Sequence, residues 1–375
     1  MRLGVDARLL TEKITGIGRY TFELCRHLSR INEPTFLYVP SHLPVKIQSS
    51  LTPAILKSDK AYGRVRRMLW SQTDLPNHAY HDSIEVFWGA THRIPQKLDV
   101  RIARVVTIHD LVWRTAGETM RPFSRLMESV LMPRAIAAAD LIMADSKSTA
   151  QELVIYYPEA ADKTRVVYLG ASEFSFGESK VPHSLSKKNK DYFLFVGTLE
   201  PRKNLRRLLQ AYAALSDVMR NSIDFVIAGG QGWGDIDLQQ IVSSLKIENH
   251  VHILGYVTDE ELYLLYKNAK FLVMPSIYEG FGLPLVESMS LGRPVLTSNT
   301  SSMPEVAGEA GILVDPYSVD SIRLGLEQLL GSKETLDRLT KLTLGVAARF
   351  TWERAAQEAM TVFKEALEIR KSKLG

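Results

Sequence analysis

Residues 278–287 read YEGFGLPLVE, and they follow closely on the apolar run FLVMPS at 271–276. The apolar run predicts a buried strand, and Pro284 suits the first turn of a helix, where a missing N–H breaks no hydrogen bond. Gly280 and Gly282 would let the backbone of the intervening loop approach a ligand closely. The stretch therefore predicts a strand–loop–helix unit, the building block of a parallel sheet.

The same alternation of strand and helix signals runs along almost the whole chain and predicts an α/β fold with parallel sheets. Between residues 172 and 191 the pattern lapses into a polar stretch, which is the best linker candidate. We therefore expect two doubly wound domains, residues 1–180 and 181–350, and a long amphipathic helix over about 351–375. The expected strands are LGVDA, TFLYVP, EVFWGA, ARVVTIH, LIMADS and RVVYL in the first half, and YFLFVG, DFVIAGG, HVHILGYV, FLVMPS, PVLTS and GILVD in the second.

The composition of the 375-residue chain, 45% hydrophobic and 23% charged, is that of an ordinary globular protein. No apolar run reaches the roughly 18 residues of a membrane-spanning helix, and the start MRLGVDARLL lacks the layout of a signal peptide. The single cysteine, Cys25, excludes an internal disulfide framework, and its helical spacing among apolar residues indicates a core thiol. We therefore expect a cytoplasmic protein.

The stretch YGRVRRMLW at 62–70 places Arg64, Arg66 and Arg67 among apolar residues. A basic amphipathic helix can lie on an anionic surface, so the stretch is a candidate for peripheral contact with the inner face of the cytoplasmic membrane. The alternative is a solvated basic face on a helix whose apolar side faces the core. Nucleic acid is not expected as a partner, because the net charge is only +4 and no nucleic-acid-binding module is recognisable.

The loop of the opening stretch is a candidate anion-binding site. The amides of Phe281, Gly282 and Leu283 would lie near a helix N-terminus, where N–H groups lack intrahelical acceptors. Glu287, about one turn into the helix, and Glu279, at the strand end, could each accept hydrogen bonds from the hydroxyls of a polyol. A helix whose first turn carries a dipole-favoured acid would explain Glu287 alone.

Two further loops could face phosphate. Arg202 and Lys203 follow the expected strand YFLFVG and suit a diphosphate, unless they are simply a solvated pair. The turn Thr15-Gly16-Ile17-Gly18 follows the first strand and resembles half of a dinucleotide fingerprint, but Thr21 stands where the third glycine should be. The turn is therefore a weak nicotinamide site and a better phosphate- or sugar-facing turn.

His109 ends another expected strand, in Ile108-His109-Asp110, where it could bond a substrate hydroxyl or serve a structural role. The acids of Asp235-Ile236-Asp237 are expected to cap a helix rather than bind metal. Thr258 and Glu261 have the spacing of a capping box and predict another helix start. No Walker loop, zinc-binding Cys/His spacing or serine elbow is present.

Taken together, the chain closely resembles the retaining glycosyltransferases of family 4, over nearly its full length. The most specific motif is E-x7-E, EGFGLPLVE at 279–287; VGTLEPRKN, TGIGRY, IHD and FTWERAA support it in the same order as in the family. The resemblance implies the GT-B fold, two Rossmann-like domains facing each other across a cleft, with residues 1–180 binding acceptor and residues 181–350 binding a nucleotide-sugar donor. It also implies that the C-terminal helix, about 351–375, packs back on the first domain.

Roles for individual residues follow from the same resemblance. Arg202 and Lys203 would neutralise the leaving diphosphate, so neither metal nor cofactor is expected. His109 would bond the donor sugar near its reacting carbon, and Glu279 would position the sugar rather than act as a nucleophile, leaving the diphosphate to take the acceptor proton. Glu287 would hold the ribose. The remaining donor-binding positions are Gly16, Ile17 and Gly18, Tyr256 and Val257 beside the base, Gly280, and Phe281, Gly282 and Leu283, whose amides would bind the distal phosphate and hold the sugar.

Within the family, the TGIGRY turn and the length are most similar to bacterial mannosyltransferases of O-antigen and related polysaccharides. The favoured donor is GDP-mannose and the favoured acceptor a lipid-linked glycan of O-antigen, lipopolysaccharide, capsule or exopolysaccharide synthesis, with other glycosyltransferases as candidate partners. The turn departs from the family's Gly-Gly pair in having Thr15-Gly16. The alternatives are a UDP-glucose or UDP-N-acetylglucosamine donor, a nicotinamide-dependent oxidoreductase and a two-lobed binding protein.

Overall fold

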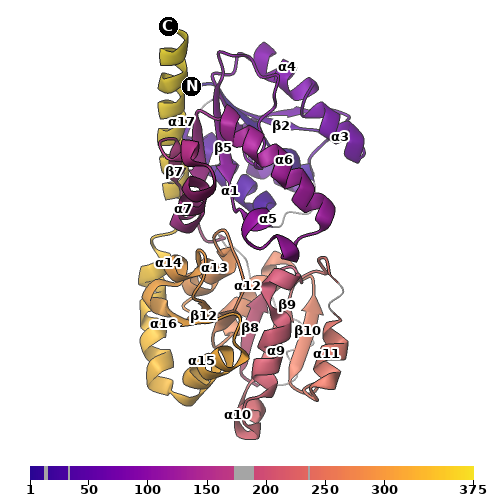
Figure 1. Ribbon diagram of the computed structural model, residues 1–375, viewed down its shortest axis with the longest axis vertical. Coiled ribbons are helices and arrows are strands. Elements are labelled where there is room, and N and C mark those ends of the chain that lie inside the picture. The colour runs from indigo at the N-terminus through magenta and orange to yellow at the C-terminus, as the bar shows by residue number, and fades with distance from the viewer. Residues whose placement is uncertain (12–15, 33, 173–189, 235–236) are drawn as a thin grey trace. The chain divides into compact units, whose positions relative to one another are not determined.

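The computed structural model describes residues 1–11, 16–32, 34–172, 190–234 and 237–375 (Figure 1). The chain forms two compact units. The first contains Met1–Arg114, Pro122–Gly170 and Thr351–Gly375, and the second contains Thr115–Arg121 and Ala171–Phe350. The expected boundary at residue 180 lies outside the described residues.

The first unit is built on a parallel sheet with seven strands among the described residues, in the order β3-β2-β1-β4-β5-β6-β7. Six of these strands were predicted; β3 was missed because its short sequence ILKS lies at the sheet edge and is only half-buried. The strands are β1 Leu3–Asp6, β2 Thr35–Val39, β3 Ile55–Ser58, β4 Val86–Gly89, β5 Ala103–Ile108, β6 Leu141–Ala144 and β7 Thr164–Val166. The helices are α1 Ile17–Ile31, α2 Val45–Ser50, α3 Arg64–Trp70, α4 Asp74–His81, α5 Val112–Thr115, α6 Pro122–Ala138, α7 Lys147–Tyr156 and α17 Trp352–Leu374.

The last helix, α17, completes the first unit, alongside which it runs in Figure 1 (yellow). It packs on α1 and β5, and its Phe363 ring lies 5.9 Å from that of Trp88 on β4. Thr351 caps its start by accepting from the N–H of Arg354 at 3.2 Å. Near its end, Arg370 forms a 2.6 Å ion pair with the buried Asp140. A capped start, an apolar face and an ion pair thus hold α17 to the first sheet.

The second unit has the same design, with a sheet in the order β10-β9-β8-β11-β12-β13. Every strand predicted for this half is present. The strands are β8 Tyr192–Val196, β9 Asp224–Ala228, β10 Val251–Gly255, β11 Leu272–Met274, β12 Val295–Ser298 and β13 Gly311–Val314. The helices are α9 Leu205–Ala213, α10 Asp217–Ser222, α11 Leu238–Ser244, α12 Asp259–Asn268, α13 Leu283–Ser290, α14 Met303–Ala307, α15 Val319–Gly331 and α16 Lys333–Ala347. Stacked rings of Phe193, Phe225 and Phe271 lie in its core.

Strand order locates the edge where chemistry is expected. In the second sheet the chain moves outward from β8 to β10 on one side and from β11 to β13 on the other, so the topological switch lies between β8 and β11. In the first sheet the switch lies between β1 and β4. Ligands of open parallel sheets bind beyond the carboxyl ends of the strands at such points. The loops after these four strands are therefore where a site belongs.

Several local predictions are confirmed. Thr258 and Glu261 form the capping box of α12, and Asp237 caps α11 by accepting from the N–H of Gln240 at 3.0 Å. Asp235 lies outside the described residues. Cys25 is fully buried in α1. No helix in the described part of the chain is long and apolar enough to cross a membrane.

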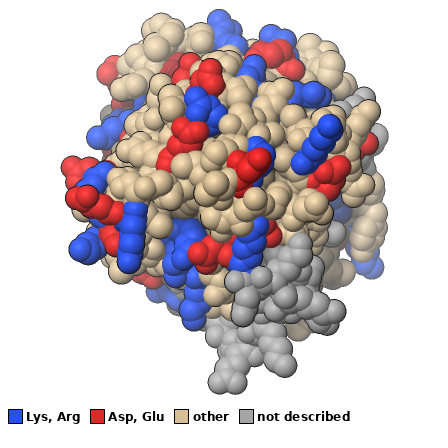
Figure 2. All heavy atoms as spheres, turned by 90° about the horizontal axis from the view of Figure 1, so that it is seen from below, with Lys and Arg blue, Asp and Glu red and all other residues tan. Residues whose placement is uncertain are grey.

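Charges are mixed on the end of the molecule drawn in Figure 2, which views it from below relative to Figure 1. Lysine and arginine side chains are interspersed there with aspartate and glutamate. On the coloured part of this face, neither sign forms an extended field of its own, in keeping with a net charge of only +4.

Replacing Phe363 with alanine should lower the free energy of unfolding by about 3–5 kcal/mol, because a fully buried ring is removed. Leu374, on the same helix, is 53% exposed, so Leu374→Ala is the matched control and should change that free energy by less than about 0.5 kcal/mol. Urea unfolding followed by tryptophan fluorescence measures both. Equally small effects would contradict the packing of α17 on the first sheet.

Candidate functional site

A buried charge cluster lies at the switch point of the second sheet. Arg202 and Lys203 end the short 3-10 helix Pro201–Lys203 after β8, and Glu279 follows β11. Lys203 Nζ donates to one carboxylate oxygen of Glu279 at 2.6 Å, and Arg202 Nη1 donates to the other at 2.5 Å. The Lys203 and Glu279 side chains are only 8% and 7% exposed. The fold thus brings Glu279 to two adjacent cations that lie far from it in the sequence.

The cluster is ionised, and both of its cations are ion-paired. Burial by itself raises the pKa of the Glu279 carboxyl, but the charges of Arg202 and Lys203 outweigh it and hold that pKa at about 2. Burial and the charge of Arg202 lower the pKa of Lys203, and Glu279 opposes them. Arg202 also pairs with Glu200 at 3.1 Å, so two cations are balanced by two carboxylates. The guanidinium and ammonium groups at the sheet edge remain the candidate donors to an anionic ligand.

The loop after β8 is fixed by the residue that follows the cations. Asn204 adopts a left-handed conformation, with φ 63°, and is 3% exposed. Its side-chain amide donates to the carbonyl oxygens of Pro275 at 2.9 Å and Pro316 at 2.6 Å. In addition, the N–H of Ile277 donates to the carbonyl of Arg202 at 2.8 Å. These bonds tie the cations to the loop that carries Glu279.

The Glu279 loop is held in turn by two serines that follow β12. The N–H of Glu279 donates to Ser301 Oγ at 3.1 Å. The hydroxyl of Ser302, which is fully buried, lies 2.9 Å from the carbonyl oxygens of both Glu279 and Phe281 and bridges them. Sequence analysis missed both serines. The signal was the polar run 299–302, which follows a predicted buried strand at the same sheet edge.

The helix α13 begins where the EGFGLPLVE motif predicts. Gly282 is its N-cap, with φ 100°, a conformation that favours glycine, and Pro284 lies in the first turn. A Cβ on Gly282 would also approach Leu285 to 3.2 Å. The amides of Gly282 and Leu283 belong to a helix end whose N–H groups have no intrahelical acceptor. The helix dipole adds partial positive charge there, next to the loop of Gly280 and Phe281.

Glu287 lies one turn into α13 and is 5% exposed. Its carboxylate oxygens accept from the hydroxyls of Ser172, at 2.5 Å, and Tyr266, at 2.8 Å. This pairing of two hydroxyls with one carboxylate is the chemistry that a vicinal diol would use. Neither partner was predicted, because Ser172 lies at the start of the polar linker and Tyr266 lies among the apolar residues of α12.

Tyr256 and Val257, predicted beside the base, follow β10. Gly255 has φ 70°, and its carbonyl accepts from the N–H of Gly229 at 2.8 Å. Tyr256 is 58% exposed. The end of this strand thus presents an aromatic side chain at the same edge of the sheet as the charge cluster.

In the first unit, His109 at the end of β5 is 5% exposed, and both of its ring nitrogens face acceptors. Nδ1 lies 2.6 Å from Asp145 Oδ2 and Nε2 lies 2.9 Å from the carbonyl oxygen of Ala90. Burial lowers the pKa of His109, but the charge of Asp145 and the hydrogen bonds reverse this and raise it. Both nitrogens face hydrogen-bond acceptors, an arrangement that favours the imidazolium form. Asp145 was missed, although it stands in the expected strand LIMADS.

The glycine turn meets His109 through α1. Gly16, with φ 46°, is the N-cap of α1, and Ile17 and Gly18 begin the helix, whereas Thr15 lies outside the described residues. Tyr20 packs edge-on against His109, with ring centroids 4.7 Å apart, and its hydroxyl lies 3.0 Å from that of Thr107. The TGIGRY and IHD motifs therefore meet at one edge of the first sheet.

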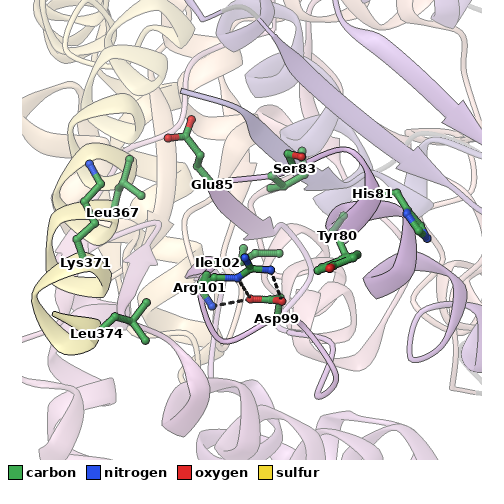
Figure 3. Close-up of a pocket in the computed structure, with 12 residues that line it drawn as sticks. Tyr80, His81, Ser83, Glu85, Asp99, Arg101, Ile102, Leu367, Lys371 and Leu374 are labelled. Carbon is green, nitrogen blue, oxygen red and sulfur yellow. Dashed lines mark hydrogen bonds and ion pairs between the residues drawn. The ribbon is translucent and has the colours of Figure 1, made fainter.

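A cavity of about 590 Å³ lies elsewhere in the first unit, between α17 and the residues that precede β4 and β5 (Figure 3). Two ion pairs lie at it, Arg101 with Asp99 at 2.8 Å and Lys371 with Glu368 at 2.9 Å. Glu85 accepts from the backbone N–H of Arg2 at 2.7 Å. None of the predicted site residues lines it. It lies at the amino ends of the strands, so it is separate from the edge described above.

Replacing Lys203 with methionine should lower the free energy of unfolding by about 3–5 kcal/mol, because the buried Glu279 carboxylate loses a partner. The double variant Lys203→Met/Glu279→Gln should be less destabilised than the sum of the single variants. The matched control is Lys270, whose 3.0 Å pair with Asp191 is exposed; Lys270→Met should cost less than about 1 kcal/mol. Denaturant titrations measure all of these, and additive single variants would contradict the coupling.

The Lys203–Glu279 pair predicts that the free energy of unfolding depends on pH. The pKa of Glu279 is lowered from 4.5 to about 2 in the folded chain. Its contribution to stability is therefore complete above about pH 4.5 and is lost as the pH falls toward about 2. The difference in free energy of unfolding between wild type and Glu279→Gln should become smaller as the pH falls from about 4.5 to about 2. A difference that stays constant would contradict an ionised Glu279 carboxylate.

Comparison with known proteins places the chain in a family. The Glycosyltransferase Family 4 model matches residues 14–172, and the Glycosyl transferases group 1 model matches residues 178–343. The O-antigen chain mannosyltransferase B of Escherichia coli is 32% identical over 378 residues, covering 94% of this chain and 96% of that protein. The serotype-specific mannosyltransferase WbdA of Escherichia coli is 31% identical over 245 residues, 61% of this chain and 29% of WbdA.

Solved structures agree on the fold. A sucrose-phosphate synthase from Thermosynechococcus elongatus has a TM-score of 0.75 at 17% identity, over 97% of this chain and 98% of that one. WaaG, a glycosyltransferase involved in lipopolysaccharide biosynthesis, has a TM-score of 0.72 at 15% identity, over 97% and 99%. With the two parallel sheets and their matched family models, these comparisons show that the chain belongs to the family 4 glycosyltransferases and has the GT-B fold of two Rossmann-like domains.

Proposed function

We propose that this glycosyltransferase moves mannose from GDP-mannose, with retention of configuration, onto a lipid-linked glycan of O-antigen or related polysaccharide synthesis. The observation that carries the proposal is the Arg202–Glu279–Lys203 cluster at the switch point of the second sheet. The choice of mannose is supported by the 32% identical relative, which is named an O-antigen chain mannosyltransferase and aligns over nearly its whole length.

The charge distribution suits departure of a diphosphate. Breaking the bond between sugar and diphosphate builds negative charge on the leaving group, and fixed cations aimed at that charge lower the barrier. Arg202 and Lys203 are held in place by Glu279 and by the backbone ties of Asn204, so little reorganisation is needed when the charge develops. We infer that these cations, with the amides at the start of α13, do this work without a metal.

Glu279 is better suited to holding the sugar than to attacking it. A carboxylate paired with two cations and with a pKa of about 2 is a weak base and a poor nucleophile. This supports a retaining reaction in which the acceptor attacks on the face of the leaving group and the diphosphate takes the acceptor proton. Glu279 would then orient the sugar hydroxyls.

The remaining groups fit the two ends of a nucleotide-sugar. Glu287 would exchange the hydroxyls of Ser172 and Tyr266 for those of a ribose, with the base beside Tyr256 and Val257. In the first unit, residues 16–18 would face the diphosphate and His109 the sugar. Since His109 Nε2 donates to the carbonyl of Ala90, contact with the sugar requires that nitrogen to change partner.

The second candidate is the same reaction with UDP-glucose or UDP-N-acetylglucosamine. Thermal shift with these donors and GDP-mannose separates the two, because a bound ligand stabilises the fold by about 2.7 kcal/mol at a hundred times its dissociation constant. We expect the largest shift with GDP-mannose, unchanged by EDTA. A larger shift with a UDP-sugar would show that this sugar nucleotide, and not GDP-mannose, is the donor. A shift that requires added metal would contradict the proposal that Arg202 and Lys203 neutralise the diphosphate.

The same assay tests the site. Glu287→Gln and Lys203→Ala should each weaken donor binding by at least about tenfold, which corresponds to a loss of roughly 1.4 kcal/mol of binding free energy. The thermal shift produced by the donor should be smaller in both variants. Glu334→Gln, on the exposed start of α16, is the control and should keep the full shift. Each variant is compared with its own ligand-free midpoint. Full shifts in both site variants would overturn the site assignment.

We also propose that α3 contributes to peripheral membrane contact. Trp70 anchors the helix: it is fully buried and its Nε1 donates to Asp59 at 2.5 Å. Leu69 is 48% exposed, and the Arg66 side chain is 59% exposed with an ion pair to Asp74 at 3.4 Å. An anchored helix that presents a cation beside an apolar side chain suits the surface of an anionic bilayer, which is where a lipid-linked acceptor lies.

Reversing Arg64, Arg66 and Arg67 to glutamate should reduce co-sedimentation with phosphatidylglycerol vesicles by at least about tenfold, because each basic residue near such a surface contributes roughly 1 kcal/mol. The matched control reverses three exposed basic residues of α16, Lys333, Arg338 and Lys341. Equal losses in both variants would indicate a general charge effect, and unchanged binding in the first would show that α3 is a solvated face only.

A further inference from the structure

His92, which follows β4 beside the switch point of the first sheet, is a buried histidine that the proposed reaction leaves unused. It is 7% exposed. Its backbone N–H donates to the carbonyl of Thr107 at 3.2 Å, and its Nε2 accepts from the backbone N–H of His109 at 2.9 Å. The two imidazole rings lie 5.0 Å apart. His92 is thus hydrogen-bonded to the main chain of His109, the residue expected to face the donor sugar.

The backbone at His92 is strained, and tight packing of the turn around it holds it in that conformation. His92 has φ 58°, in the left-handed region, which costs roughly 1–3 kcal/mol for a residue with a side chain. The turn closes so tightly that a Cβ on Gly89 would lie 1.9 Å from the carbonyl oxygen of Arg93. Strain of this kind persists where a structure holds a side chain at one position, and here that side chain is an imidazole aimed at β5.

The hydrogen bonds assign the tautomer of His92. Because Nε2 accepts from His109, it carries no proton, so in the neutral ring the proton is on Nδ1. Nδ1 faces Glu128 of α6 at 3.6 Å, and Glu128 also accepts from Arg93 at 2.7 Å. Burial raises the pKa of Glu128, but His92 and Arg93 outweigh it and lower that pKa. His92 therefore lies between an ionised Glu128 and the His109 amide.

We propose that His92 is a positioning residue for glycosyl transfer, whose neutral ring holds the main chain of His109 at the sheet edge and whose protonation releases it. The inference rests on the proposed function, in which His109 serves the donor sugar. The groups that face His92 are Arg93 of its own loop, Glu128 of α6 and His109 of β5, and Asp145 of β6 faces it through His109.

The direction of the pH effect follows from the bonding. A protonated His92 donates from both nitrogens, so it can no longer accept from the His109 N–H. That buried amide would be left without its acceptor and the end of β5 would shift. Displacement of a group beside the reacting atoms by about 1 Å can cost roughly a hundredfold in rate. Loss of this acceptor, by protonation or by substitution, should therefore slow transfer.

The test uses the full chain with GDP-mannose, and kcat and KM are measured between about pH 5 and pH 8, where histidine titrates. His92→Leu removes the acceptor and should lower kcat by roughly tenfold to a hundredfold at every pH with little change in KM. His92→Gln places an amide oxygen near the position of Nε2 and does not titrate, so it should rescue most of that loss and remove the slowing caused by protonation. His78→Gln is the control, since His78 also pairs with a carboxylate, Asp59 at 2.8 Å, outside the site.

A measurement without a donor separates this inference from the proposed function. Nuclear magnetic resonance of chain labelled with ¹⁵N-histidine follows the His109 amide as the pH falls. The resonance should move in wild type and in His78→Gln and stay in place in His92→Gln. Absence of turnover with GDP-mannose would reject GDP-mannose as the donor. The measurement of the His109 amide resonance would still test the role of His92. A His109 amide that moves equally in His92→Gln, or a His92→Leu variant with wild-type kcat, would overturn the role of His92.

Discussion

A carboxylate buried between two cations sets the geometry of the functional edge of the second unit. Removing one partner of such a cluster leaves an uncompensated charge in a place that water does not reach, which costs several kcal/mol. The loops after β8 and β11 must therefore keep their mutual register. Asn204 and Ser302 serve that requirement: one ties the cationic loop to its neighbours, and the other ties the acidic loop to the residues after β12.

The two units use the same sheet design for different electrostatics. At the edge of the second unit, fixed charges and a helix start favour an anion. At the edge of the first, the central groups are two imidazoles and a carboxylate, joined by hydrogen bonds: His92, His109 and Asp145. A division of this kind suits a reaction in which one side stabilises a departing diphosphate and the other side positions the sugar.

The sequence predicted the fold class well because buried parallel strands leave long apolar runs and the turns between them carry glycine and proline. The half-buried edge strand β3 leaves neither signal and was missed. Motif residues such as Glu279 could be predicted as site residues because their spacing is local. Ser172, Tyr266 and Ser302 could not be found in this way, because each acquires its role from a partner that is distant in the sequence.

The assignment of α17 to the first unit has a consequence for how the chain is made. The second unit is inserted within the first, since residues 351–375 return to it after Phe350. During synthesis the second unit can emerge whole and fold while the first still lacks its final helix. The apolar surface on α1 and β5 that α17 covers stays open until α17 has been made, so the acceptor side proposed for this enzyme matures after the second unit.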